Sequence, residues 1–582
     1  MVSIRVAAAQ FFSGHNVVDN IALCERYVRQ AAEAGAQLVV LPENSNRVRT
    51  YADREDCWRN AETLDGPFIT ELRALSRELG LHLVVGVDVR GETAPNVYIT
   101  SLLLGPNGEI IGTHRKHVLW DYEYTLFVPS DEPYQVFHTE LGRLGLLICA
   151  DGIVPETPRV LSLLGAQELC NSLNSRGPDE LRVHVPLRAM ENRVWHISAN
   201  TVGGPSNDFP WMGGSQIIDP DGRQHAVASE TFPELIVADI DPSLANDKLQ
   251  PGIGDVIARR RPDLYRTLTV PLADVPAVAM YGPADGDSRP VTVAPLQVSW
   301  FPSSEWSVTR ALAQIEYAGR RGVALGVLPE MFCFHRNEIA DGPAFAARRS
   351  DDVLGRLTKA VAAAGIHAVA NLVEQDGGRY FSTAYVIDSS GRIVHAYRKT
   401  HLRVDELEWA TPGDRIDVVP TGVGALGVLI SDEIWIPEVA RVLALKGAEI
   451  LCHPTDWDRD EAATVAATER CEENRVHIVS TTRLDSPSLI GSQVLRADEF
   501  VGGQPIALMR YPTGYWARPG FEEQVAIELD LREANSKMMG LQLDPLATRA
   551  PFLYGPLVAR AASGRRGSER QAATDEERVA HH

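Results

Sequence analysis

The sequence has few cysteines, and none stands at a spacing typical of a disulfide framework. Seven cysteines are spread over 582 residues without a CxxC pair, and their number is odd. Disulfide-rich secreted domains and zinc fingers show close, repeated cysteine spacings. We therefore expect reduced thiols, as in cytosolic proteins, and no zinc finger.

Long apolar runs and basic tracts are also missing from the sequence. No stretch approaches the roughly 18 apolar residues of a membrane span, and the apolar part of MVSIRVAAAQ is too short for a secretory signal. A formal charge of −21 repels nucleic acid and anionic lipid. These features predict a cytoplasmic protein that acts on small molecules, with no nucleic-acid or membrane partner.

One unit of sequence occurs twice in the chain. RVAAAQFF recurs as VTVAPLQV, AGAQLVVLPENS as RGVALGVLPEMF, and RAMENRVWHISA as RCEENRVHIVST. The offset is 287 residues from Glu43 to Glu330 and 282 residues from Cys149 to Ser431. Matches that stay collinear over this length indicate a tandem duplication.

The duplication divides the chain into two domains of one architecture. In each unit short apolar strands alternate with helical patterns, which predicts an α/β fold with largely buried sheets. The turn-rich YGPADGDSRP separates the units, and the polar end lacks apolar periodicity. We expect a first domain at 1–275, a linker at 276–290, a second domain at 291–560 and a disordered tail at 561–582.

Three reactive side chains of the first unit each follow a predicted strand. Glu43 ends QLVVLPE, Lys116 follows EIIGTHR, and Cys149 ends RLGLLIC. Sheets that align these strands bring all three residues to one rim, where α/β proteins usually bind ligands. The positive end of the helix that begins near Pro155 favours a thiolate at Cys149, and the alternative is a buried core cysteine.

The other two residues also have a chemical and a structural interpretation. Glu43 is placed to take the thiol proton and later to activate water. Lys116 is placed to stabilise an oxyanion together with the backbone N–H of Ala150. The alternatives are a solvated loop glutamate and a surface lysine. The repetition of this placement in the second unit favours the chemical interpretation.

At LPEN, HRKHVLWDYE and LICADGIVPE the sequence resembles the glutamate, lysine and cysteine signatures of the nitrilase, or carbon-nitrogen hydrolase, superfamily. The resemblance covers nearly all of both units and implies αββα sandwich domains. It implies Glu43 as base, Lys116 as oxyanion stabiliser, Cys149 as nucleophile and Glu123 as a second, positioning glutamate. It implies no metal or organic cofactor. In the implied reaction the thiolate adds to an amide or nitrile carbon, and water hydrolyses the resulting thioester.

The subclass within this superfamily stays open. True nitrilases commonly follow the nucleophile with Trp-Glu, and many amidases and carbamoylases with Tyr-Asp, whereas this chain has Ala150 and Asp151. The aspartate favours an amidase acting on a small amide or carbamoyl compound. The alternatives are a nitrilase, an amide-forming acyl transferase, or a non-catalytic interaction module. Candidate substrate contacts, with loop capping and core packing as the alternative, are Ala150, Asn171, Asn174, Trp120 and Tyr122.

The second unit keeps Glu330, Lys399 and Glu406 but has Ser431 in place of the cysteine. A serine hydroxyl has a much higher pKa than a thiol and needs a stronger base than a carboxylate. We therefore expect a degenerate site. The favoured role of this unit is to replace the partner of a homodimer, forming an intrachain pseudo-dimer. A regulatory ligand site and an active serine hydrolase are the alternatives, and further homo-oligomerisation stays open.

Overall fold

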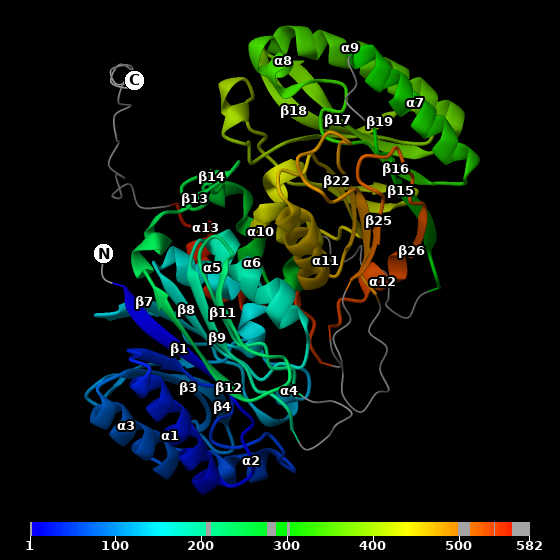
Figure 1. The fold of residues 1–582 in the computed structure, drawn as a ribbon. Coiled ribbons are helices and arrows are strands. Elements are labelled where there is room, and N and C mark those ends of the chain that lie inside the picture. The colour runs from blue at the N-terminus through cyan, green and yellow to red at the C-terminus, as the bar shows by residue number, and fades with distance from the viewer. Residues whose placement is uncertain are drawn as a thin grey trace, which may run out of the picture.

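The computed structural model describes residues 3–204, 211–275, 287–298, 303–498, 512–539 and 542–560. Two repeated α/β units lie side by side in Figure 1, the first coloured blue to green and the second green to orange. None of the described helices is long and apolar enough to cross a membrane. The predicted tail, and the part of the predicted linker up to residue 286, lie outside the described residues.

The first unit contains two six-stranded mixed sheets. One has the order β12-β1-β2-β3-β4-β5, with bounds Glu234–Ile240, Ile4–Gln10, Leu38–Val40, His82–Arg90, Val97–Leu104 and Ile110–Arg115. The other has the order β11-β10-β9-β8-β7-β6, with bounds Gln224–Val227, Gln216–Ile218, Trp195–Ala199, Glu168–Ser172, Gly142–Ile148 and Val136–Thr139. Strands β1 to β3 and β7 to β9 run parallel, so their carboxyl ends point the same way within each sheet.

Helices cover the outer faces of both sheets. Residues of α1 (Val17–Glu33) and α3 (Pro67–Leu79) pack on the first sheet, and residues of α5 (Glu156–Leu163) and α6 (Val185–Asn192) pack on the second. Between the sheets lies a separate apolar layer that includes Val6, Leu38, Leu146 and Ile197. The predicted αββα sandwich is confirmed. The short helices α2 (Arg54–Asn60) and α4 (Glu123–Leu126) flank the carboxyl ends of the strands.

The second unit repeats this architecture. Its first sheet has the order β19-β18-β17-β16-β15-β26, with bounds Ile393–Arg398, Arg379–Ile387, His367–Asp376, Leu325–Val327, Pro290–Pro295 and Ile527–Asp530. Its second sheet has the order β20-β21-β22-β23-β24-β25, with bounds Val418–Thr421, Gly424–Val428, Ile450–Pro454, His477–Thr481, Gln493–Arg496 and Thr513–Trp516. Its helices are α7 (Ser304–Arg320), α8 (Arg336–Asp341), α9 (Pro343–Ala364), α10 (Pro437–Leu445), α11 (Ala467–Asn474), α12 (Leu531–Asn535) and α13 (Gly555–Val558).

The two units pack through α5 and α6 of the first unit and α10 and α11 of the second. Helices α5 and α10 directly follow the turns that begin at Cys149 and Ser431. Side chains of α5, α6, α10 and α11 belong to one hydrophobic cluster that spans both units, and Figure 1 shows these helices next to one another. The four helices therefore form a shared double layer between the two second sheets. This arrangement confirms the predicted intrachain pseudo-dimer.

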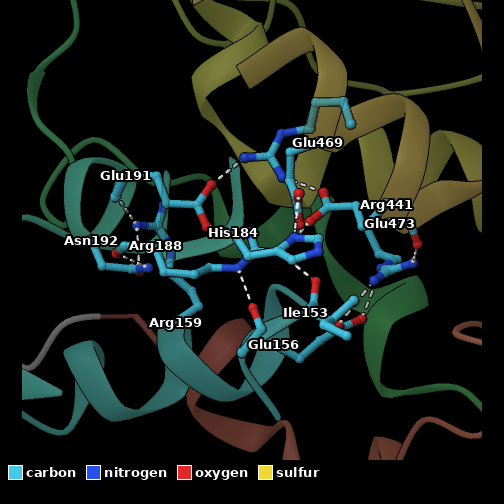
Figure 2. A network of polar contacts seen from close by, with 12 residues as sticks. Ile153, Glu156, Arg159, His184, Arg188, Glu191, Asn192, Arg441, Glu469 and Glu473 are labelled. Atoms are coloured by element: carbon cyan, nitrogen blue, oxygen red, sulfur yellow. Dashed lines mark hydrogen bonds and ion pairs between the residues drawn. The ribbon is translucent and has the colours of Figure 1, made fainter. Parts of the chain in front are cut away.

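Buried charges cross this interface in symmetric pairs, which Figure 2 shows in part. Four positions of the first unit recur 282 residues later with the same residue type: Glu156 and Glu438, Arg159 and Arg441, Arg188 and Arg470, and Glu191 and Glu473. Arg159 Nε donates to Glu438 Oε1 at 2.9 Å, and Arg441 Nε lies 3.0 Å from Glu156 Oε1. Arg188 Nη2 lies 2.7 Å from Glu473 Oε2, and Arg470 pairs with Glu191.

The same arginines also bind the turns that follow the strands. Arg188 Nε donates to the Gly152 carbonyl at 2.8 Å and its Nη2 to the Ile153 carbonyl at 2.5 Å. Arg470 Nε donates to the Ile434 carbonyl at 3.0 Å. Each arginine thus connects the turn of its own unit with glutamates of the other.

Loss of one interface carboxylate should be costly, and Glu438→Gln is the direct test. Burial alone raises the pKa of Glu438, but Arg159 and Arg260 overcome this and hold the pKa below its usual value. The amide leaves two buried guanidinium groups without their counterion, so we expect a loss of about 3–5 kcal/mol in the free energy of unfolding, measured by urea denaturation. Because the folded pKa is depressed, this loss persists above pH ~4.3 and shrinks as the pH falls toward the folded pKa.

The matched control is Glu25→Gln, which removes an exposed carboxylate paired with Arg29 at 2.8 Å. An exposed pair contributes less than about 1 kcal/mol, so the urea midpoint should move little. Equal shifts for the two variants would contradict the claim that the buried ion pairs stabilise the fold more than an exposed pair does.

Candidate active site

Three buried charged residues meet beside the first sheet of the first unit. Glu43 follows β2, Lys116 follows β5, and Glu123 is the first residue of α4. Lys116 Nζ donates to Glu43 Oε1 at 2.9 Å and to Glu123 Oε2 at 2.8 Å. The side chains are at most 1% exposed, so the ammonium group is held between two carboxylates away from bulk water.

Cys149 lies on the facing sheet, at the end of β7. It begins the short 3-10 turn η1 (Cys149–Gly152) with a φ of 45°, a left-handed conformation that is uncommon for a residue with a side chain. The Cys149 N–H donates to Asn171 Oδ1 at 3.0 Å. The Glu43 N–H donates to the Leu173 carbonyl at 3.2 Å, which joins the ends of β2 and β8. The predicted rim is therefore formed by two facing sheets.

The turn after Cys149 is held by Asp151. Its carboxylate accepts hydrogen bonds from the backbone N–H groups of His117 at 3.0 Å and Val118 at 2.9 Å. It also lies 2.8 Å from His114 Nε2 and accepts the Ile148 N–H at 3.3 Å. Asp151 is fully buried, so the turn belongs to the core. The aspartate therefore fixes the shape of the turn.

The environment of Cys149 favours the neutral thiol. Burial raises the pKa of Cys149 to about 12; the Glu43 carboxylate adds to the rise, and Lys116 opposes it. The predicted stabilisation of a thiolate by a helix is wrong. Helix α5 begins only at Glu156, beyond the turn, and the effect of a helix terminus falls off within one turn.

Sequence reasoning missed Arg49. Its side chain is 6% exposed, pairs with Glu123, and has Nη2 3.5 Å from Glu43 Oε2. It also lies 5.9 Å above the ring centroid of Tyr122. The charges alone could have indicated that an arginine or a second lysine is present, because two buried carboxylates and a single lysine leave an unbalanced negative charge. No spacing rule identifies which arginine balances it.

The other residues predicted to contact the substrate lie in different environments. Asn171 lies within β8 and binds the Cys149 backbone, so it orients the turn, and Asn174 Nδ2 donates to Asn44 Oδ1 at 3.3 Å. Tyr122 is 43% exposed. Ala150 and Trp120 belong to an apolar cluster with Met539 and Leu543 of the second unit. Side chains of the other unit thus belong to the apolar cluster around Ala150.

The second unit reproduces the polar framework of the first. Lys399 Nζ lies 3.2 Å from Glu330 Oε1 and 2.7 Å from Glu406 Oε2, and Ser431 has a φ of 51°. The Glu433 carboxylate binds the backbone around Ser431 as Asp151 does around Cys149, accepting the Ile430 N–H at 2.9 Å. The shape of the turn is therefore kept without the sulfur.

The surroundings of Ser431 differ from those of Cys149 in charge. Asp432 stands where the first unit has Ala150, and it pairs with Arg403 at 2.6 Å. At the position of Asn171 stands His453, whose Nε2 lies 2.9 Å from the Ser431 carbonyl oxygen. The Ser431 hydroxyl has no hydrogen-bond partner within the described part of the chain.

Two clusters of the described residues have the composition of a metal site. In the cluster of His114, His117 and Asp151, the carboxylate oxygens are already used by backbone N–H groups and by His114. The other cluster lies at the interface between the units and is treated below.

Comparison with known proteins places the chain in a family. The carbon-nitrogen hydrolase family matches residues 5–248 and 292–474. A nitrilase from Pyrococcus abyssi is 32% identical over 247 residues, 42% of this chain and 92% of that protein. An N-carbamoylputrescine amidase from Arabidopsis thaliana is 29% identical over 289 residues, 46% of this chain and 95% of that protein. A deaminated glutathione amidase from Homo sapiens is 31% identical over 284 residues, 46% of this chain and 85% of that protein.

The two matches cover more than half of the sequence, so the chain belongs to the carbon-nitrogen hydrolase family and carries two of its domains in tandem. The predicted superfamily and the duplication are confirmed. The relatives are amidases and nitrilases, and the chain is an enzyme of this class. Each relative corresponds in length to about one unit of the chain.

A raised thiol pKa has a measurable consequence. Thiolate absorbs in the ultraviolet and neutral thiol does not, so the difference in absorbance between wild type and Cys149→Ala reports the ionisation of Cys149. We expect no thiolate signal near pH 7 and a rise only toward the alkaline limit of folding, because the pKa lies at about 12. A full thiolate signal near pH 7 would show that Lys116 outweighs burial.

Proposed function

We propose that the chain hydrolyses a small amide or carbamoyl compound through a thioester at Cys149 of the first unit. The observation that carries the proposal is the buried set of Glu43, Lys116 and Glu123 beside a strained cysteine turn. The amidases among the relatives support the choice of an amide substrate.

In the proposed first step, Glu43 removes the thiol proton as sulfur attacks the carbonyl carbon. Because burial raises the pKa of the thiol, proton transfer to Glu43 accompanies formation of the bond to substrate and does not precede it. Negative charge develops on the substrate oxygen, and Lys116 Nζ and the Ala150 N–H stabilise it. Protonated Glu43 then gives its proton to the leaving nitrogen, and ammonia or an amine departs from the thioester.

In the second step, Glu43 acts as base toward water, which attacks the thioester carbon. The carboxylic acid or carbamate leaves, and the proton returns to sulfur. Glu123 and Arg49 act by position: Glu123 holds Lys116 at 2.8 Å, and Arg49 balances the second carboxylate. Lys116 and Arg49 thus bring two positive charges to two buried carboxylates.

The second unit serves in this proposal as an internal partner. Its glutamates bind Arg188, which in turn holds the carbonyls of Gly152 and Ile153 just after Cys149. Its residues Met539 and Leu543 cover Ala150. These contacts support a positioning role, whereas a Ser431 hydroxyl without a hydrogen-bond partner among the described residues disfavours a serine hydrolase.

A nitrile substrate is the second candidate, because the relative from Pyrococcus abyssi carries the name nitrilase. A nitrile and the matching amide would give the same acid and ammonia, so the two substrates are compared by rate. An amide product in the presence of an amine acceptor would instead identify acyl transfer.

Variants of the two turns test the assignment. Cys149→Ala should lower ammonia release from a panel of small amides by about four orders of magnitude or more, because the nucleophile is removed. Ser431→Ala should leave turnover nearly unchanged. Both variants remove one buried atom from matched turns, so thermal unfolding serves as the folding control. Equal losses of activity in two folded variants would refute a single active site.

A further inference from the structure

The interface contains a second group of polar residues that does not follow the symmetry of the arginine-glutamate pairs. Asp179 and His184 come from the first unit, and Glu469 and Glu472 come from α11 of the second. The position 282 residues after His184 is Ala466, and the position 282 residues before Glu472 is Met190. Each unit therefore supplies polar groups that its counterpart lacks.

The first-unit residues of this group lie at an irregular helical turn. Asp179 precedes the π-helical turn η2 (Glu180–His184), and its Oδ1 accepts the Glu180 N–H at 3.2 Å. The turn leads directly into α6. The second unit has the same π-helical turn at η10 (Ala462–Ala466), so the turn belongs to the shared fold, and the histidine is what the first unit adds to it.

His184 is oriented from one side by a carboxylate. Its Nδ1 lies 2.7 Å from Glu469 Oε2, and Figure 2 shows the imidazole directed across the interface toward Glu469. Donation of the Nδ1 proton to this carboxylate leaves Nε2 with a free lone pair. A carboxylate behind a histidine is the arrangement that orients histidine ligands in metal sites.

The opposite side of His184 faces two further carboxylates at a distance that fits a bridging ion. Its Nε2 lies 3.7 Å from Asp179 Oδ2 and 3.7 Å from Glu472 Oε1. These separations are too long for hydrogen bonds. Two ligands of a tetrahedral ion with bonds of about 2.1 Å are about 3.4 Å apart, so a small movement accommodates a cation.

The facing atoms have no hydrogen-bond partner within the described ranges. This holds for His184 Nε2, Asp179 Oδ2 and both carboxylate oxygens of Glu472. The three residues are at most 2% exposed. The neighbouring guanidinium of Arg188 is engaged by Glu191, Glu469 and Glu473. His184 lies within ion-pair distance of Asp179 and Glu472 and can offer them a single positive charge. Two buried carboxylates facing one imidazole keep an excess of negative charge, which a divalent cation bound to all three residues would balance.

We propose that Asp179, His184 and Glu472 bind a divalent transition-metal ion that links the two units. One imidazole nitrogen and two carboxylates suit Zn²⁺ and Mn²⁺, with water completing the coordination. Glu469 holds the histidine in the ligating tautomer. The ion acts on the interface, and the proposed thioester chemistry does not require it.

Metal content of the intact chain tests this proposal. The full-length protein is treated with chelator, incubated with excess Zn²⁺ or Mn²⁺, separated from free ion by gel filtration and measured by elemental mass spectrometry. We expect about one ion per chain with at least one of the two metals, and a thermal midpoint that rises with the concentration of that metal. Competition between the metals shows which one the site prefers.

Glu472→Met and His184→Ala place at each position the residue found in the other unit, which favours folding of the variants. Both should lose the bound ion and the metal-dependent rise in thermal midpoint. His196→Ala is the matched control, because His196 is also fully buried and both of its ring nitrogens lack hydrogen-bond partners in the described structure, yet it is no part of the cluster. Cys149→Ala should likewise keep the ion.

Two results would overturn the proposal. One is a wild-type chain that retains neither metal after gel filtration, which would mean that protons alone neutralise the cluster. The other is a folded Glu472→Met variant that retains as much metal as wild type.

Discussion

The constraint on which the structure depends is the burial of guanidinium groups between the two units. Arg188 binds two carbonyls of the turn in its own unit and two glutamates of the other, and Arg470 binds one of each. A buried guanidinium is stabilised only when carboxylates and carbonyls surround it, so each arginine ties the packing of the two units to the turn of its own unit. The same set of bonds fixes how the two units are aligned, where α5 and α10 lie, and where the turns end. The interface therefore reaches the residues next to Cys149 directly, through Gly152 and Ile153.

This constraint explains why a unit without the cysteine keeps the shape of a catalytic domain. The turn at Ser431 is held by Glu433 and Arg470, and neither contact involves the atom at the nucleophile position. Loss of sulfur leaves the turn, the interface and the partner turn intact. The replacement of Ala150 and Asn171 by Asp432 and His453 changes the chemistry of the second site but leaves the carbonyl contacts with the arginine in place. The contacts of the second unit at the interface thus do not depend on the atom at the nucleophile position.

Much of this organisation is visible in the sequence. The strands before Glu43 and Cys149 follow from apolar runs, because strands buried on both faces are nearly uniformly apolar. The strand before Lys116 is half buried and of mixed composition, and the repeat of its sequence in the second unit is what marks it. Contacts between residues that are far apart in the sequence cannot be predicted from these patterns. Arg49 is six residues from Glu43, but only the fold brings it to Glu123, and Met539 reaches Ala150 from the end of the other unit. The thiol pKa was misjudged because burial at the turn depends on packing from all sides, which a helix start in the sequence does not report.

The central claim is that one thiol, on the first of two equivalent turns, carries the covalent chemistry. The most direct measurement is mass spectrometry of peptides from the wild-type chain after acid quenching during turnover of an amide substrate. The account predicts that the peptide containing Cys149 gains the mass of the acyl group, while the peptide containing Ser431 stays unmodified. Acylation of Ser431, or turnover with no acyl group on Cys149, would contradict it.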